Sequence, residues 1–309
     1  MKILYMGTPW IAAECLKTLI ADRQEILAVF TQPDRPKGRG MKLAKPEVKL
    51  LAEERGIPVF QPKKLKKSME IIEELAPELI VVVAYGRLLP KVMLDYPRYG
   101  CVNLHASLLP RLRGAAPIQR AIVNGDTVGG VTTMYMAEEL DAGDVIFCEE
   151  TEISNSDTGG SLTEKYAGIG GKLLVKTIKA IEEGSVKAIP QDGGRATFAP
   201  PIGKEEARID WTGSAEEIRN LIRGFNPAPA AFTTLGGQQL KVFAADSLPE
   251  TGGAHRPGEV IAVLKNGLEV SAGKGRLVIT EVQAAGKKRM NAGDWLRGKR
   301  IEPGTVLGE

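Results

Sequence analysis

Cysteine and histidine are scarce in this chain of 309 residues, which contains three cysteines and two histidines. Cys15, Cys101 and Cys148 are far apart and form neither a CxxC pair nor a cluster with histidine. This spacing argues against a structural zinc site and is typical of proteins from a reducing compartment. We therefore expect a cytoplasmic protein that holds no metal.

Long apolar runs are missing as well. No run is long enough to span a bilayer, and the first residues lack the apolar region of a signal peptide. The formal net charge is only +3, which by itself indicates no anionic partner. We expect no membrane partner, and any nucleic-acid signal must come from local clusters of charge.

A dinucleotide-binding signature is the third absence. Gly7-Thr8-Pro9 ends the first predicted strand, at the turn where doubly wound folds often bind phosphate. The pattern GxGxxG is not completed there, so we expect no dinucleotide cofactor. A tight turn at the start of a helix accounts for Pro9.

Short apolar runs alternate with helical patterns in the first two-thirds of the chain. Such alternation predicts βαβ units and therefore an α/β fold with a Rossmann-like parallel sheet. The predicted strands are residues 3–6, 26–30, 79–85, 101–104 and 131–136. The predicted helices are residues 12–19, 46–55, 69–75, 116–123 and 162–181.

The pattern changes near residue 185. Residues 184–203 are rich in glycine and proline and predict a linker. A helical pattern follows at 205–220, in which Ser214 and Glu217 have the spacing of a capping box. Five short strand-like runs separated by glycine then predict a small OB-like β-barrel, at 231–234, 240–245, 259–263, 268–270 and 277–282. We expect two domains, 1–189 and 209–309, joined by a linker at 190–208.

The most informative segment is the predicted strand that carries Asn103 and His105. On a strand, residues i and i+2 point to the same face, so an amide and an imidazole project together from a strand end. Open α/β sheets place their sites at such ends. With a carboxylate such as that of Asp141, this pair could stabilise an oxyanion and move a proton. The alternative is a hydrogen-bonded core histidine and an unrelated turn aspartate.

The loop Ser107-Leu108-Leu109-Pro110 follows this strand directly and favours the site over the core histidine. A loop stopped by proline at a strand end can line a flat ligand with backbone donors and acceptors. Arg111 and Arg113 come next, and they either reach the mouth of the site or are simply solvated.

Basic clusters indicate where nucleic acid could bind. Residues 31–45 form a long segment with five basic residues and one acidic residue, in which proline and glycine exclude regular structure. A loop of this length inside an α/β unit is usually functional or disordered, and its charge suits a phosphate backbone. Lys63-Lys64-Leu65-Lys66-Lys67 and Lys287-Lys288-Arg289 are further clusters, each of which could equally be a solvated face.

Taken together, these segments resemble the methionyl-tRNA formyltransferase family over nearly the whole chain. The Asn-x-His…Asp set alone marks a broader formyltransferase superfamily, whereas the basic loop and Ile209-Asp210-Trp211 are specific to the initiator-tRNA enzymes. The motifs that carry the resemblance are Gly7-Thr8-Pro9, Gln32-Pro33-Asp34-Arg35-Pro36, Gly38-Arg39-Gly40, Val83-Ala84-Tyr85-Gly86, residues 103–110, residues 113–120, Lys204-Glu205-Glu206-Ala207-Arg208-Ile209-Asp210-Trp211, Phe225-Asn226-Pro227 and Gly286-Lys287-Lys288-Arg289-Met290.

The resemblance implies a role for each part of the chain. Residues 1–189 would bind 10-formyltetrahydrofolate, and residues 209–309 would help to hold tRNA. The implied catalytic residues are Asn103, His105 and Asp141, and the implied folate-binding residues are Ser107, Leu108, Leu109 and Pro110. Arg39 corresponds to the arginine that meets the tRNA acceptor. The basic residues beside it, Lys37 and Lys42, and the separate basic pair Lys287 and Lys288 are assigned to tRNA as well. Trp10, Pro201 and Ala228 depart from the family pattern, which usually has an acidic residue, lysine and tryptophan there.

The implied reaction is transfer of a formyl group from 10-formyltetrahydrofolate to the α-amine of methionyl-initiator tRNA by a monomer. Asn103 can donate a hydrogen bond to the oxyanion, and so can His105 when protonated, a state that Asp141 would stabilise. Two alternatives remain open. A related formyltransferase acting on a small amine would not need the basic loop, and a non-enzymatic RNA-binding protein would not need the three polar residues.

Overall fold

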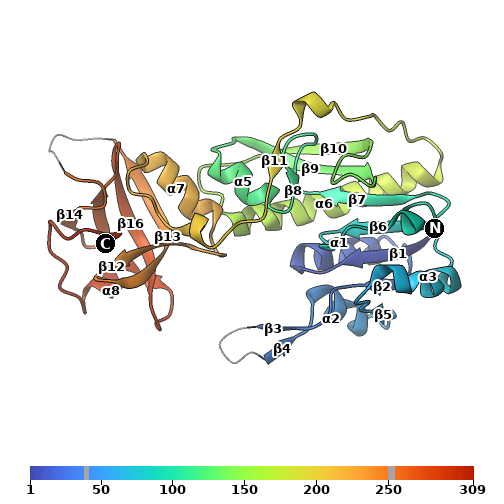
Figure 1. Cartoon of the computed structure of the whole chain (residues 1–309), viewed down its shortest axis with the longest axis horizontal. Helices are drawn as coiled ribbons and strands as arrows, with labels where there is room; N and C mark the ends of the chain where they lie inside the picture. Colours follow the sequence, from blue (N-terminus) through green and yellow to red (C-terminus); the bar gives the residue numbers. More distant parts are fainter. Residues whose placement is uncertain (38–41, 250–254) are drawn as a thin grey trace. The chain divides into compact units, whose positions relative to one another are not determined.

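The structure is a computed structural model that describes residues 1–37, 42–249 and 255–309 (Figure 1). The chain divides into two compact units. The first unit comprises Met1–Pro117, Val128–Glu152 and Thr163–Pro200, and the second comprises Ile118–Thr127, Ile153–Leu162 and Pro201–Glu309. The second unit therefore takes in two segments that precede the predicted linker.

A seven-stranded sheet organises the first unit, in the order β10-β9-β7-β6-β1-β2-β5 (Figure 1). Its strands are β1 (Lys2–Gly7), β2 (Glu25–Phe30), β5 (Val59–Phe60), β6 (Leu79–Val83), β7 (Cys101–His105), β9 (Val128–Tyr135) and β10 (Val145–Glu152). The strands from β7 to β5 are parallel, as predicted. The prediction of a parallel sheet was incomplete, because β9 and β10 run antiparallel at one edge. Exposed Glu149 and Glu150 interrupt the apolar pattern of β10, so that strand was missed.

Both faces of this sheet are covered by helices, which is why its strands are almost continuously apolar. On one face, Leu4, Met6, Phe30 and Val82 pack in a cluster with Ile72. That cluster brings in η1 (Leu65–Ser68), α3 (Met69–Leu75) and α4 (Lys91–Leu94). On the other face lie α1 (Trp10–Ala21) and α6 (Gly159–Glu182), and α2 (Glu47–Glu54) packs beside α1.

The turn after β1 is tight for reasons of packing. A Cβ atom on Gly7 would lie 2.7 Å from the Cβ of Ala12 and 3.0 Å from the carbonyl oxygen of Val83. Only glycine therefore lets α1 approach the ends of β1 and β6 this closely. The glycine needs no bound phosphate to explain it.

The basic segment at 31–45 is more regular than predicted. β3 (Arg35–Lys37) and β4 (Lys42–Ala44) pair antiparallel, so the expectation of no regular structure was wrong. A polar cluster holds the base of this hairpin: Lys49 Nζ lies 2.9 Å from each carboxylate oxygen of Asp34, and Gln61 Nε2 donates to Asp34 Oδ1 at 2.8 Å. These hydrogen bonds, that from Gln61 above all, lower the pKa of Asp34. Pro36 lies within β3 opposite Leu43, so proline did not prevent this pairing.

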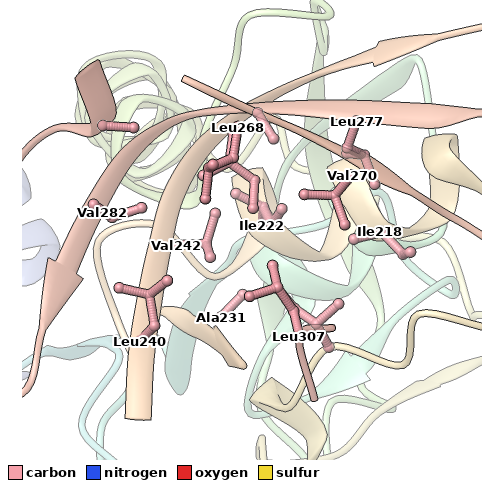
Figure 2. Close-up of a cluster of buried hydrophobic side chains, with 14 of the residues drawn as sticks. Ile218, Ile222, Ala231, Leu240, Val242, Leu268, Val270, Leu277, Val282 and Leu307 are labelled. Atoms are coloured by element: carbon pink, nitrogen blue, oxygen red, sulfur yellow. The ribbon is translucent and has the colours of Figure 1, made fainter. Parts of the chain in front are cut away.

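The second unit is built on an antiparallel sheet in the order β12-β13-β16-β15-β14, with β17 paired to β16. Its strands are β12 (Ala231–Leu235), β13 (Gln238–Leu248), β14 (Val260–Val263), β15 (Leu268–Ser271), β16 (Arg276–Ala284) and β17 (Met290–Asn291). Figure 2 shows its core, where side chains of these strands meet Ile218 and Ile222 of α7 (Ala215–Gly224). All five predicted strands are present, as expected for a small OB-like domain.

The start of α7 was predicted only in part. Ser214 and Glu217 form the predicted capping box, each side chain accepting from the other's backbone N–H. The helical pattern at 205–220 nevertheless breaks into η3 (Glu205–Ala207) and α7, because Ile209 and Trp211 are pulled into the core of the unit. The short helix α8 (Ala292–Leu296) was not predicted.

The two early segments are tied to the second unit by specific contacts. Arg223, which is buried, donates from one guanidinium nitrogen to the carbonyl oxygens of Ser154 and Asp157 at 3.1 and 3.2 Å. The backbone N–H of Gly160 donates to the carbonyl oxygen of Asn226 at 2.9 Å. A Cβ atom on Gly224 would lie 2.8 Å from Val123, in the segment that carries α5 (Pro117–Val123). These segments are thus part of the second unit's own packing.

The described ranges, 1–37, 42–249 and 255–309, contain neither a membrane-spanning helix nor a cluster of metal-ligating side chains. Within them no helix is long and apolar enough to cross a membrane. Nor do three or more histidine, cysteine, aspartate or glutamate side chains come together there as a metal site would require.

Candidate active site

The site is built on β7, which occupies the middle of the sheet between β6 and β9. Cys101 belongs to the α3/α4 face, since its Sγ lies 3.5 Å from the carbonyl oxygen of Met93. Leu104 points the opposite way, towards Gly170 of α6. Because alternate residues share a face, Asn103 and His105 project with Cys101. Burial raises the pKa of Cys101 to about 12, so this thiol stays neutral beside them.

His105 lies at the carboxyl end of β7 with its ring 6% exposed. Its Nε2 is 2.9 Å from the carbonyl oxygen of Leu112, and its Nδ1 is 3.6 Å from Oδ2 of Asp141. A carbonyl oxygen can only accept, so Nε2 carries a hydrogen and the neutral ring has its lone pair on Nδ1. The gap to Asp141 exceeds the 2.7–3.2 Å of a direct N–H···O bond. The lone pair of His105 Nδ1 and the carboxylate oxygen Oδ2 of Asp141 thus lie on either side of a 3.6 Å gap.

Asp141 is held in an unusual backbone conformation. Its φ is +50°, a left-handed value that costs a residue with a side chain roughly 1–2 kcal/mol. Its Oδ2 accepts a hydrogen bond from the backbone N–H of Gly114 at 2.8 Å, and its carbonyl oxygen accepts from Nε2 of Gln191 at 2.9 Å. These bonds fix both the backbone and the carboxylate of Asp141 beside His105.

Asn103 is buried, with 9% of its surface exposed. Throughout the described part of the chain, no group forms a hydrogen bond with its side-chain amide. This amide lies on the same strand face as His105. Its N–H groups are thus available to a substrate.

The loop Ser107–Pro110 is held from below by one threonine. Thr132, on the neighbouring strand β9, donates from Oγ1 to the carbonyl oxygen of Ser107 at 2.7 Å and accepts from the N–H of Leu109 at 3.2 Å. Leu108 packs over Gly130 of the same strand. The loop is consequently pre-formed, with Leu108, Leu109 and Pro110 partly exposed.

Several residues of the site were missed by sequence reasoning, and they lie where a linker was predicted. β11 (Phe198–Ala199) pairs with β8 (Arg113–Gly114), directly behind the His105 loop. Thr197 Oγ1 accepts from the N–H of Leu112 at 2.9 Å, and Gln191 contacts the Asp141 loop. No periodic pattern marks this stretch, because each residue acts through its own hydrogen bond. Arg113 is buried, whereas Arg111 is exposed.

The residues predicted to bind tRNA lie in two separate parts of the chain. Arg39 lies outside the described residues. Lys37 ends β3 and Lys42 begins β4, so both lie at the head of the hairpin. Lys287 and Lys288 are exposed in the turn between β16 and β17, and neither has an ion-pair partner in the described ranges.

Comparison with known proteins places this chain in a family. Residues 1–178 match the family model for formyl transferase, and residues 201–300 match the model for the formyl transferase C-terminal domain. The methionyl-tRNA formyltransferase of Bacillus velezensis is 50% identical over 311 residues, covering 100% of this chain and 98% of its own. That of Bacillus subtilis is 48% identical over 310 residues, covering 99% and 98%.

The chain belongs to the methionyl-tRNA formyltransferase family.

Solved structures share the fold of this family at low sequence identity. HypX from Aquifex aeolicus in complex with tetrahydrofolic acid has a TM-score of 0.68 and 18% identity, covering 99% of this chain and 51% of that chain. An N-formyltransferase from Helicobacter canadensis in complex with folinic acid and dTDP-3-aminofucose has a TM-score of 0.69 and 18% identity, covering 92% and 99%. The full-length relatives decide between the alternatives, because they are enzymes named for tRNA. The chain is thus no non-enzymatic RNA-binding protein.

Proposed function

We propose that Asn103, His105 and Asp141 carry out, in this chain, the reaction of the methionyl-tRNA formyltransferases. The enzyme transfers the formyl group of 10-formyltetrahydrofolate to the α-amino group of methionyl-initiator tRNA, which yields N-formylmethionyl-tRNA for translation initiation. One observation supports the assignment of residues best. The ring of His105 is fixed between the Leu112 carbonyl and the Asp141 carboxylate, on the strand face that bears the unpartnered amide of Asn103.

The chemistry requires a nucleophile, a place for charge and a route for a proton. The amine nitrogen of methionine forms a bond to the formyl carbon, and the bond from that carbon to N10 of the folate breaks. The formyl oxygen carries negative charge between these events. The amine loses one proton and N10 gains one, so no net oxidation, reduction or proton uptake occurs.

Asn103 suits the charge that develops on the formyl oxygen. Its side-chain amide has no hydrogen-bond partner among the described residues, so its N–H groups are free to donate when the oxyanion forms. Preorganised donors of this kind are worth about 3–4 kcal/mol in the transition state. The residue is therefore assigned as the oxyanion donor.

His105 and Asp141 suit the proton. An amine or a water that reaches the gap between Nδ1 and Oδ2 meets two acceptors. Proton transfer to Nδ1 gives an imidazolium that the carboxylate stabilises, and this ring can then donate to the oxyanion or return the proton to the leaving nitrogen. The Leu112 carbonyl keeps Nε2 protonated throughout, so the ring works through Nδ1.

The loop Ser107–Pro110 is assigned to the folate co-substrate. A flat heteroaromatic ring needs apolar contact on its faces and hydrogen-bonding groups at its edge. The partly exposed Leu109 and Pro110 provide the first, and the backbone of a loop clamped by Thr132 provides the second. The tRNA is assigned to the hairpin of β3 and β4 and to the turn at Lys287 and Lys288. Since one chain carries all these sites, we propose that the enzyme acts as a monomer, in the cytoplasm where charged tRNA is used.

The acceptor can be tested directly. Purified protein, 10-formyltetrahydrofolate and an acceptor are incubated, and the formylated product is measured by mass spectrometry. Methionyl-initiator tRNA should be formylated, whereas methionine methyl ester and an amino sugar at equal concentration should not. Preferential formylation of either small amine would contradict the proposed acceptor.

Substitution of Arg39 by alanine should raise the KM for methionyl-tRNA and leave folate affinity unchanged. An arginine can hold a phosphate with two parallel hydrogen bonds, which a shorter or neutral side chain cannot reproduce. Titrating tRNA and folate separately into both proteins measures the two affinities. If folate binding weakens as much as tRNA binding, Arg39 belongs to the formyl-donor site instead.

Substitution of both Lys287 and Lys288 by alanine should weaken tRNA binding and flatten its dependence on salt. Each lost phosphate contact reduces the slope of log K against log salt by about 0.7–0.9. Lys66 and Lys67, which are also adjacent and exposed, provide the matched control. Equal changes in the Lys66/Lys67 double variant would show that net charge, rather than this turn, governs binding.

A further inference from the structure

The side-chain amide of Gln191 connects the Asp141 loop to Arg113. Its Nε2 lies 2.9 Å from the carbonyl oxygen of Asp141 and 2.7 Å from that of Gly143. Its Oε1 accepts from Nε and from a terminal nitrogen of Arg113 at 3.1 and 2.9 Å. Two donors and one acceptor thus connect β8 to the loop that presents the carboxylate.

Arg113 determines which way this amide points. A guanidinium has only donors, so the oxygen of Gln191 must face it and the NH2 group must face the loop. The arginine side chain is 5% exposed, which shields these bonds from water. Arg113 also precedes Gly114, whose N–H donates to Oδ2 of Asp141 at 2.8 Å. The same two-residue strand thereby holds the carboxylate directly and its backbone through Gln191.

The backbone that Gln191 holds is one that would not persist without support. Asp141 has φ of +50°, and Gly143 could not carry a Cβ atom because one would collide with the carbonyl oxygen of Tyr135. A residue in the left-handed region remains there only when its surroundings over-determine it. Without the two N–H donors, rotation of the Asp141 peptide would move the carboxylate away from Nδ1 of His105.

We propose that Gln191 is a positioning residue for formyl transfer. Together with Arg113, it keeps the Asp141 carboxylate beside Nδ1 of His105. This inference rests on the proposed catalytic role of Asp141. Gln191 touches no reacting atom, so its loss should lower kcat while the KM for each substrate stays nearly constant. Misplacement of a catalytic group by about 1 Å can cost on the order of 100-fold in rate.

Two variants separate positioning from simple packing. Gln191→Glu keeps an oxygen for Arg113 and adds a favourable charge, but it sets an oxygen against the carbonyls of Asp141 and Gly143. Gln191→Met keeps the shape and removes every hydrogen bond. Positioning predicts that both lower kcat about 10- to 100-fold, with folate Kd within about twofold, whereas a role in packing against Arg113 alone predicts an active Gln191→Glu protein. Thermal melting and folate binding identify any variant that does not fold, in which case the other one provides the test.

The neighbouring residue supplies a matched control. Asp192 accepts from the N–H of Gly194 at 2.9 Å and caps the next turn, η2 (Gly193–Arg195), and among the described residues its side chain forms no hydrogen bond with the Asp141 loop. Asp192→Ala should therefore retain nearly full kcat. If it loses as much activity as Gln191→Glu, the linker acts as a whole and the role of Gln191 is not specific.

A double-variant comparison distinguishes failure of this inference from failure of the catalytic assignment. Asp141→Asn should itself lower kcat, and adding Gln191→Glu to it should cost little more, because both act through the same carboxylate. Wild-type turnover in Asp141→Asn would overturn the catalytic assignment. Two results would overturn the positioning role alone, each with a lowered kcat for Asp141→Asn. In the first, Gln191→Glu has the kcat of the wild type. In the second, the kcat losses of the two single variants multiply in the double variant.

Discussion

Replacement of His105 by alanine is expected to lower kcat for formyl transfer by about 10²- to 10⁴-fold, the usual contribution of a positioned general acid or base. Nδ1 of this ring can take the proton of the amine, because Nε2 is already bonded to the carbonyl oxygen of Leu112. Single-turnover rates with saturating 10-formyltetrahydrofolate would measure the loss at the chemical step. The affinity for methionyl-tRNA should change little, since the nucleic acid is assigned to other surfaces.

The second histidine of the chain offers the control. His255 is partly exposed in the second unit and lies 3.1 Å from Glu259. His255→Ala likewise removes an imidazole that lies beside a carboxylate, yet it should leave turnover unchanged. A folded His105→Ala protein that turns over at a near-normal rate would contradict the assignment of His105.

Asn103→Ala is expected to lower kcat by about 10²- to 10³-fold, as the loss of one oxyanion donor does in other acyl transfers. Asn103→Asp should be at least as damaging, because it exchanges a donor for a negative charge facing the developing oxyanion. Both changes leave every hydrogen bond of the described structure intact, since the Asn103 amide takes part in none. Asn103→Ala should therefore retain its stability while activity falls, whereas Asn103→Asp also places a charge at a buried position, which lowers stability.

Asn124, which is exposed at the end of α5, provides the comparison for Asn103. Its replacement by alanine should change neither turnover nor melting temperature. The decisive measurements are kcat and the melting temperature of Asn103→Ala. A fall in stability with unchanged turnover would mean that Asn103 supports the core rather than the reaction.

The parallel part of the sheet could be predicted because each of its strands is buried on both faces and therefore reads as an unbroken apolar run, such as the one that became β6. β10 could not be predicted for the opposite reason, since an edge strand with exposed glutamates has no such run. The capping box of Ser214 and Glu217 was predictable because it is a local interaction over three residues. The broken helix before it was not, because burial of Trp211 in the core is a tertiary effect.

For the site, the sequence indicated the strand pair of Asn103 and His105 because strand geometry alone puts them on one face. It could not indicate how Asp141 is held. That depends on Gln191, 50 residues further on, and on the left-handed backbone of a residue that is not glycine. The resemblance in motifs identified Asp141 as the carboxylate, whereas the hydrogen bonds that hold it are visible only in the structure.

The second unit is not a module that can be cut off at the linker. Residues 118–127 and 153–162 contribute to it from within the span of the formyl transferase model, which ends at residue 178. Exchange of C-terminal domains between homologues by fusion near residue 200 would therefore join an α7 from one parent to supporting segments from the other. Arg223 and Gly224 would then meet foreign partners at positions 123, 154 and 157. Successful chimaeras should carry these short segments along with the domain, so the residues that must be exchanged together are not continuous in the sequence.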